Sequence, residues 1–167
     1  MGLTHKFPSV VNITQEVGFD DIQMDDDSLN DGDSVDYRVS LETVFSLYTK
    51  LRFSYDHNVK NASLRSEYAQ YDANTASLGI SHAINPKTSA FFDYSYEWQD
   101  FSSSDRLPGQ ANVDRETDIH SLGLTLSRKL NNWLTADASY NYTKRDTDFA
   151  REGYTDNKLS VAVTAKY

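Results

Sequence analysis

The chain has 167 residues, the length of a single domain with room for a hydrophobic core. It contains no cysteine, which excludes a disulfide framework and cysteine-based zinc or redox sites. With 16 Lys and Arg against 25 Asp and Glu, the net charge is -9, which argues against nucleic acid as a partner.

Hydropathy excludes one way of crossing a membrane and leaves another open. No run of about 18 apolar residues is present, so the sequence predicts no transmembrane helix. The mean hydropathy of -0.63 does not exclude membrane strands, because a barrel strand turns only alternate residues towards lipid.

The first third of the chain alternates apolar and polar residues, which predicts strands over 11–19, 35–43 and 47–56. The segment 20–33 between the first two is rich in Asp and is predicted to be a solvated acidic loop. A turn of a few residues near Phe45 to Leu47 joins the second strand to the third.

The middle of the chain continues the same pattern. After a polar stretch at 57–71, residues 75–81 and 89–98 predict two more strands, joined by a tight turn at Asn85-Pro86-Lys87. The segment 101–116 contains Ser102, Ser103, Pro108 and Gly109 and is predicted to be a long loop.

The last third predicts three strands, at 121–127, 134–142 and 157–167. Asn131-Asn132 forms a tight turn before the second of them, and a loop at 147–155 precedes the last. The sequence thus predicts eight strands with connections that are alternately long and short.

An internal repeat supports this division of the chain. Residues 84–96 align without gaps on residues 130–142, and residues 45–57 fit the same frame more loosely. Each copy covers a turn and the strand after it, so the chain is predicted to be a series of similar hairpins.

One face of every predicted strand is apolar, and its middle carries no charged residue. The opposite face carries Ser, Thr and Gly together with charges, which we expect to form a network inside a lumen: Arg38, Glu42, Lys50, Arg52, Asp93 and Asp137. Alternation alone also fits a soluble ligand-carrying barrel, whose apolar face would point inwards. The alternating connection lengths favour a membrane barrel, in which turns on one side are short and loops on the other are long.

Aromatic residues gather towards the strand ends, as two interfacial girdles require. Those expected at the turn side are Phe45, Tyr48, Trp133 and Tyr167. Those expected at the loop side include Tyr94, Tyr96, Trp98, Tyr140 and Tyr142.

These motifs resemble Gram-negative outer-membrane β-barrels. The resemblance rests on the turn Asn with alternating Ala and Leu, on Ser139-Tyr140-Asn141-Tyr142, and on the end Val161-Ala162-Val163-Thr164-Ala165-Lys166-Tyr167. The chain is most similar to the β-barrel porins of exopolysaccharide gene clusters, which are usually longer. The resemblance implies an antiparallel up-and-down barrel of about eight strands, either complete or the carboxy-terminal part of a larger barrel.

The same resemblance implies partners and an assembly signal. Outer-membrane lipid, lipopolysaccharide and the barrel-assembly machinery are the expected partners. The last strand is the expected signal for that machinery, through Leu159, Val161, Val163 and Tyr167.

Little in the sequence points to catalysis. His120-Ser121 and Asp56-His57 are sequence neighbours, so in a strand the members of each pair point to opposite faces. We therefore expect no enzyme and no cofactor. The acidic loop departs from a calcium-binding loop at Leu29 and Arg38, which leaves Asp25, Asp27 and Asp31 as a weak site for divalent cations.

The sequence predicts a single-domain integral outer-membrane barrel with a lumen filled by polar side chains. Its expected role is that of a non-enzymatic scaffold or a narrow porin of low conductance. Part of a larger channel for solute or polysaccharide export is the alternative, and a soluble ligand carrier is the second.

Overall fold

The computed structural model describes residues 2–6, 11–22, 32–61, 70–101, 114–149 and 152–166. These residues form a single antiparallel sheet in which each strand pairs with the next along the chain. The strands are β1 (Gly2–Lys6), β2 (Val11–Ile22), β3 (Gly32–Ser46), β4 (Thr49–Asn61), β5 (Gln70–Asn85), β6 (Thr88–Phe101), β7 (Arg115–Lys129), β8 (Leu134–Thr147) and β9 (Tyr154–Ala165).

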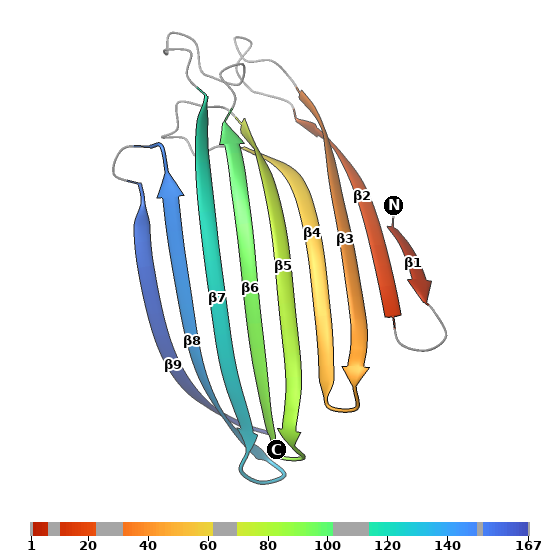
Figure 1. Ribbon diagram of the computed structural model, residues 1–167, viewed down its shortest axis with the longest axis vertical. Helices are drawn as coiled ribbons and strands as arrows, with labels where there is room; N and C mark the ends of the chain where they lie inside the picture. The colour runs from red at the N-terminus through yellow and green to blue at the C-terminus, as the bar shows by residue number, and fades with distance from the viewer. Residues whose placement is uncertain are drawn as a thin grey trace.

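The predicted all-β antiparallel architecture is confirmed. All eight predicted strands are present as β2 to β9, and β1, which the sequence analysis did not predict, pairs with β2 from Gly2 opposite Glu16 to Lys6 opposite Asn12. The sheet is not closed into a barrel. It curls so that β9 passes behind β8, and β1 and β9 lie at its two edges (Figure 1).

Several strands are longer than predicted, and the loops are correspondingly shorter. The predicted loop at 57–71 was wrong at both ends, because His57 pairs with Asn74 and Asn61 pairs with Gln70. The predicted loop at 101–116 was wrong at its ends too, since Phe101 pairs with Arg115. Pairing to a neighbouring strand extends each hairpin beyond the point where the apolar alternation fades.

The three short connections that the structure describes share one hydrogen-bonding feature. The backbone N–H of Lys87 donates to Asn85 Oδ1, and that of Trp133 donates to Asn131 Oδ1, each at 2.9 Å. The N–H of Tyr48 donates to Ser46 Oγ at 3.2 Å. A side-chain oxygen that caps the N–H two residues on is typical of tight turns. Ser46, Asn85 and Asn131 occupy equivalent positions in the internal repeat, so the repeat preserves the turn.

The sheet is one layer thick over most of its area. Apart from Gly123 in the middle of β7, the buried residues of the described segments lie near the loop end, and they are Ala73, Asn74, Gln99, Phe101 and Thr117. Elsewhere large apolar side chains remain exposed, including Leu159 at 76% and Val161 at 75%. An apolar face of this extent requires lipid or another apolar surface to cover it.

Candidate functional site: the polar face

Strand register aligns many polar side chains of β2 to β9 in three neighbouring rows that cross the sheet. The lower charged row contains Glu42, Arg52, Asp93 and Lys158, with Asn12, Gly79, Gly123 and Asn141 between or beside them. The hydroxyl row consists of Thr14, Ser40, Ser54, Ser77, Ser95, Ser121 and Thr143 and reaches Asp156 on β9. The upper charged row contains Glu16, Arg38, Asp56, Glu97 and Arg145.

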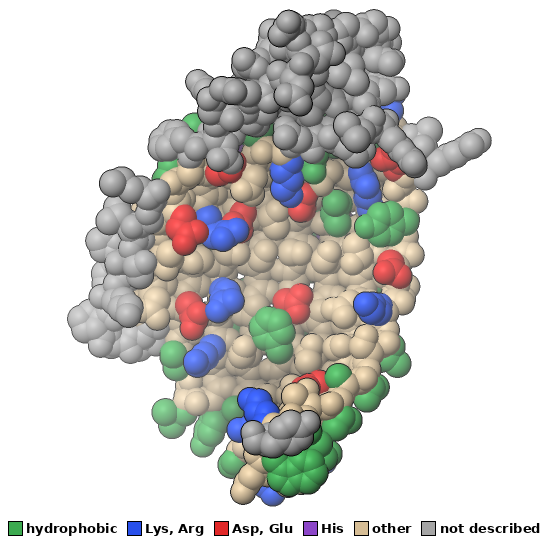
Figure 2. Space-filling model, turned by 180° about the vertical axis from the view of Figure 1, so that it is seen from behind, with side chains coloured by type: hydrophobic (Ala, Val, Ile, Leu, Met, Phe, Trp, Pro, Cys, Tyr) green, Lys and Arg blue, Asp and Glu red, His purple; other side chains and the backbone are tan. Residues whose placement is uncertain are grey.

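Figure 2 shows this face of the molecule. Lys, Arg, Asp and Glu side chains gather over its middle in two bands, with uncharged surface between them. The sheet curls towards this side, as the position of β9 in Figure 1 indicates. The charged and hydroxyl side chains therefore lie on the inside of the curve.

In the lower charged row, charged side chains stand next to glycines. Arg52 Nη2 lies 3.1 Å from Glu42 Oε2 in the neighbouring strand. A Cβ added at Gly123 would lie 2.8 Å from the carboxylate carbon of Asp93, so the carboxylate occupies the space above this glycine. At Gly79 the nearest atoms belong to the Phe91 ring, at 3.6 Å. From β4 to β8 the row thus alternates positions that carry a polar side chain with glycines.

The upper charged row takes part in more ion pairs than the lower one. Arg38 lies between two carboxylates, with Nη1 3.7 Å from Glu16 Oε2 and Nε paired to Asp56. Lys60 Nζ lies 3.3 Å from Glu97 Oε1, which also accepts a 2.6 Å hydrogen bond from Gln99 Nε2. Arg38 and Lys60 therefore each contact at least one carboxylate.

The six charges predicted to form one network all lie on the polar face, but the contacts among them are few. Glu42 and Arg52 pair with each other, while Arg38 pairs with Glu16 and Asp56, which the sequence analysis did not include. Asp137 accepts a hydrogen bond from Ser127 Oγ. Within the described ranges, Lys50 and Asp93 form no ion pair.

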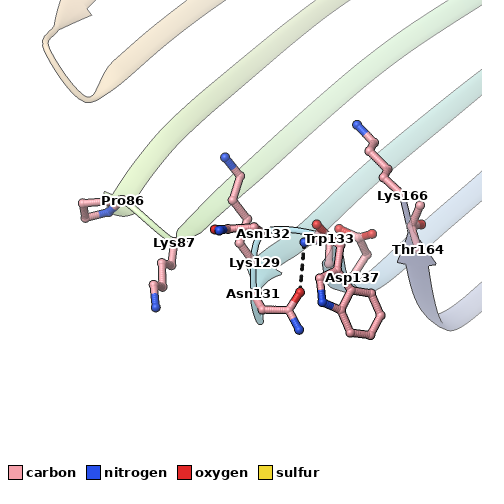
Figure 3. A pocket seen from close by; sticks show the side chains of 10 residues that line it. Pro86, Lys87, Lys129, Asn131, Asn132, Trp133, Asp137, Thr164 and Lys166 are labelled. Carbon is pink, nitrogen blue, oxygen red and sulfur yellow. Dashed lines mark hydrogen bonds between the residues drawn. The ribbon is translucent and has the colours of Figure 1, made fainter.

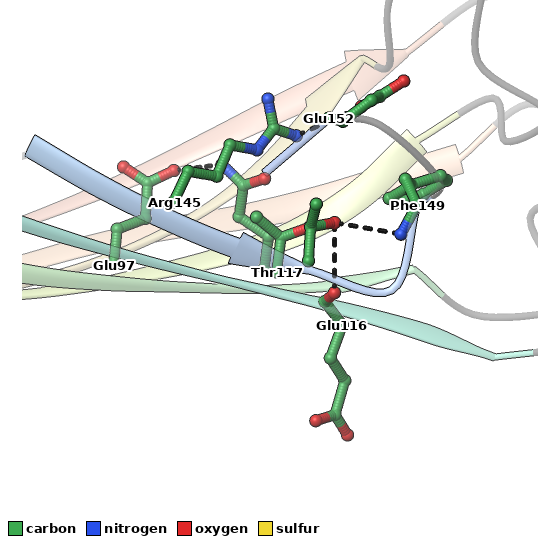
Figure 4. Close-up of polar contacts among 8 residues, drawn as sticks. Glu97, Glu116, Thr117, Arg145, Phe149 and Glu152 are labelled. Carbon is green, nitrogen blue, oxygen red and sulfur yellow. Dashed lines mark hydrogen bonds and ion pairs between the residues drawn. The ribbon is translucent and has the colours of Figure 1, made fainter. Parts of the chain in front are cut away.

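A polar cluster at the loop end was missed by the sequence analysis (Figure 4). Thr117 is only 1% exposed and shares a 2.6 Å hydrogen bond with Thr147. Arg145 Nη2 lies 3.6 Å from Glu152, whereas its Nε is buried and has no hydrogen-bond partner among the described residues. The signal was weak because Thr117 and Arg145 lie beyond the regular alternation used to place β7 and β8.

The turn end of the polar face contains a hollow of about 860 Å³ (Figure 3). Its lining includes three lysines and Asp137, and the complete set is Pro86, Lys87, Lys129, Asn131, Asn132, Trp133, Thr135, Asp137, Thr164 and Lys166. The hollow lies between the turns and the end of β9, and basic groups predominate in it.

On the apolar face, aromatic rings form a band near the loop end. Tyr96 stacks on Trp98 at 5.4 Å and on His120 at 4.8 Å between ring centroids. The band continues through Tyr55, at 5.9 Å from Trp98, to Tyr37. The tyrosine hydroxyls of this band also make polar contacts. Tyr96 Oη donates to Asp118 Oδ1 at 2.6 Å, and Tyr94 Oη lies 2.9 Å from His120 Nδ1.

The other predicted aromatics lie where their strands place them. Tyr140 and Tyr142 are on the apolar face of β8, and Tyr140 Oη donates to Asn157 Oδ1 at 2.6 Å. At the turn end Phe45, Tyr48 and Trp133 are exposed by 76%, 62% and 55%. Rings near both ends of the strands match the distribution of aromatics expected at two membrane interfaces.

Some predicted residues lie outside the structurally described part of the chain. They are Asp25, Asp27 and Asp31 of the weak cation site and Tyr167 of the last strand. Leu159, Val161 and Val163 are described, and they project from the apolar face of the edge strand β9. Within the described segments, His, Asp and Glu side chains nowhere gather in a group of three that could hold a metal ion.

Comparison with known proteins identifies a family. Residues 13–167 match the family model described as Putative beta-barrel porin 2, which supports the predicted resemblance. No curated protein and no solved structure matches the chain. The described residues also contain no helix long and apolar enough to cross a membrane.

Proposed function

The chain belongs to the Putative beta-barrel porin 2 family, and from this premise we propose that it forms a single-domain barrel in the outer membrane. The polar face lines the lumen in this proposal, and the apolar face meets lipid. The protein acts without catalysis, as a membrane scaffold or as a narrow porin of low conductance.

The observation that carries this proposal is the separation of side chains between the two faces. Arg38, Arg52 and their carboxylate partners lie inside the curve of the sheet, while Leu159 and Val161 are exposed on its outside. A soluble barrel would place these faces the other way round. A charged side chain facing lipid at the bilayer midplane costs about 2 to 4 kcal/mol, so an apolar face whose middle carries no charge suits hydrocarbon.

The proposed narrowness follows from the two charged rows. In a barrel of about eight strands the interior is just wide enough for side chains. Long, paired side chains at two levels would restrict the lumen to a small passage. Outer-membrane lipid, lipopolysaccharide and the barrel-assembly machinery are the proposed partners, and β9 with Leu159 and Val163 is the proposed assembly signal.

Two measurements test this function. Folded protein in detergent is expected to migrate faster on a gel before boiling than after it, as a stable barrel does. In planar bilayers it is expected to give small, discrete conductance steps. Protein that is monodisperse in plain buffer without any amphiphile would contradict the proposal, because the apolar face would then be internal.

One observation favours a second function, that of one part of a larger channel. The sheet is open, so strands from elsewhere could complete a wider barrel at its β1 and β9 edges. Large, steady conductance from this chain would support the wider channel over the narrow porin. Such a channel would serve solute or polysaccharide export.

A further inference from the structure

The hydroxyl row differs from the rows above and below it in having unused hydrogen-bonding capacity. Its seven Ser and Thr side chains, from Thr14 on β2 to Thr143 on β8, are all half-buried. None of them forms a side-chain hydrogen bond with another described residue. By contrast, Arg38 and Arg52 in the neighbouring rows form ion pairs with carboxylates.

The hydroxyl row also has the smallest side chains of the three rows. Five of its seven members are Ser, and no long side chain interrupts it between β2 and β8. Since an interior of about eight strands is filled by side chains of ordinary size, a level lined by Ser leaves space unfilled. Polar space of this kind holds water, because each hydroxyl must find a partner.

We infer that the hydroxyl row lines a hydrated chamber in the lumen, and that the chamber takes small uncharged polyols such as glycerol. The inference rests on the proposed function, because it requires the polar face to enclose a lumen. A polyol offers donors and acceptors that match hydroxyls. An anion gains little at this level, because Arg38 and Arg52 on either side already pair with carboxylates and the seven hydroxyls carry no charge.

Single cysteines test the chamber directly, because the chain contains none of its own. Ser95→Cys and Ser121→Cys, which are cross-strand neighbours, place a thiol in the row. Leu122→Cys is the matched control on the apolar face, one residue along β7. A small, uncharged, water-soluble thiol reagent is expected to modify both row thiols in folded protein in liposomes and to leave the control thiol largely unmodified.

Glycerol permeation tests whether the chamber admits a small polyol. Liposomes that contain the wild-type protein are expected to swell in glycerol, and Ser95→Phe with Ser121→Phe is expected to slow the swelling severalfold. Ser95→Ala with Ser121→Ala keeps the space but removes two hydroxyls, so a smaller reduction is expected. Potassium chloride conductance measured on the same preparations is expected to be little altered by the alanine pair.

The outcomes separate this inference from the proposed function. Unreactive row thiols in a protein that is folded and heat-modifiable would overturn the chamber while leaving the barrel intact. Ion conductance without glycerol permeation would overturn the choice of solute. Protein that never acquires a folded form in membranes would overturn the proposed function, and the chamber with it.

Discussion

Individual residues of the polar face report whether that face is enclosed. Arg52 and Glu42 form an ion pair at 3.1 Å, and in the open sheet the arginine side chain is 70% exposed. An exposed pair contributes about 0 to 1 kcal/mol, whereas breaking an enclosed pair leaves an uncompensated charge and costs about 3 to 5 kcal/mol. The size of the loss therefore discriminates between an open face and a lumen.

We predict that Arg52→Leu lowers the unfolding temperature in detergent clearly more than Lys144→Leu does. Lys144 pairs with Asp146 at 2.6 Å on the outer face near the loop end, which makes it a matched exposed pair. Arg38→Leu is expected to cost at least as much as Arg52→Leu, because Glu16 and Asp56 would be left together. Equal melting curves for Arg52→Leu and Lys144→Leu would show that the polar face is open to water.

Gly123 provides a second residue-scale prediction. A methyl group there would collide with the Asp93 carboxylate, which must rotate away, while Gly79 has open contacts of 3.6 Å or more. We expect Gly123→Ala to reduce the free energy of unfolding by about 1 kcal/mol, and Gly79→Ala to leave it nearly unchanged. Urea titration in detergent measures both. The loss should vanish in an Asp93→Ala background, and a loss that persists there would point to a backbone cause.

The hairpin turns show how far the sequence predicts an element. Period-two alternation located β2 to β9, and the repeat marked Asn85 and Asn131, because a tight turn needs a local side-chain acceptor that is visible in the sequence. The ends of β4 and β5 were not predictable in this way. His57, Asp72 and Asn74 are polar residues at apolar-face positions there. These ends are strands because they pair with a neighbouring strand, although the apolar alternation has stopped.

The turn acceptors lead to a prediction at the scale of the hairpin. We expect Asn85→Ala and Asn131→Ala each to cost about 0.5 to 1.5 kcal/mol, the net value of one hydrogen bond. Asn85→Ser should retain most of the stability, since Ser46 serves the same position in the first hairpin. Asn132→Ala is the control, as its side chain forms no hydrogen bond with the described residues. Denaturant midpoints that fall equally for Asn131→Ala and Asn132→Ala would contradict the shared capping role.

The rows of the polar face belong to the scale of the whole molecule, and the sequence did not reveal them. Alternation assigns a residue to a face but does not say which residues of neighbouring strands stand opposite each other. That register depends on the turns and on the irregularities between Val44 and Ser46 and between Ala83 and Asn85. The charges were therefore predicted to share a face, while their true partners, such as Asp56 for Arg38, emerged only from the pairing.

Closure of the sheet depends on whether β1 or β9 pairs with the edge of β2 that β3 leaves free. Successive antiparallel pairing makes β1 and β9 run in the same direction, so joining them would create a parallel seam of at most the 5 residues of β1. β2 and β9 run in opposite directions and have 12 residues each. Because unpaired backbone groups are costly in hydrocarbon, the longer β2 to β9 seam is favoured in a membrane, and it requires β1 to leave β2.

The tilt of the strands fixes where that seam should form. The hydroxyl row starts near the turn end of β2 at Thr14 and reaches Asp156 near the loop end of β9, so a closed barrel must pair β2 with a later part of β9. A shear of about eight residues places Thr14 opposite Thr164 and Gln15 opposite Val163. In the open sheet Gln15 is instead paired with Leu3.

These two pairings exclude each other, which makes closure testable with disulfides. We predict that Gln15→Cys with Val163→Cys cross-links on oxidation after folding into lipid, whereas Leu3→Cys with Gln15→Cys cross-links only before insertion. Reducing and non-reducing gels distinguish the two products. A Leu3 to Gln15 disulfide that forms equally well in the membrane, without any Gln15 to Val163 product, would mean that β1 retains its place and that other strands complete the barrel.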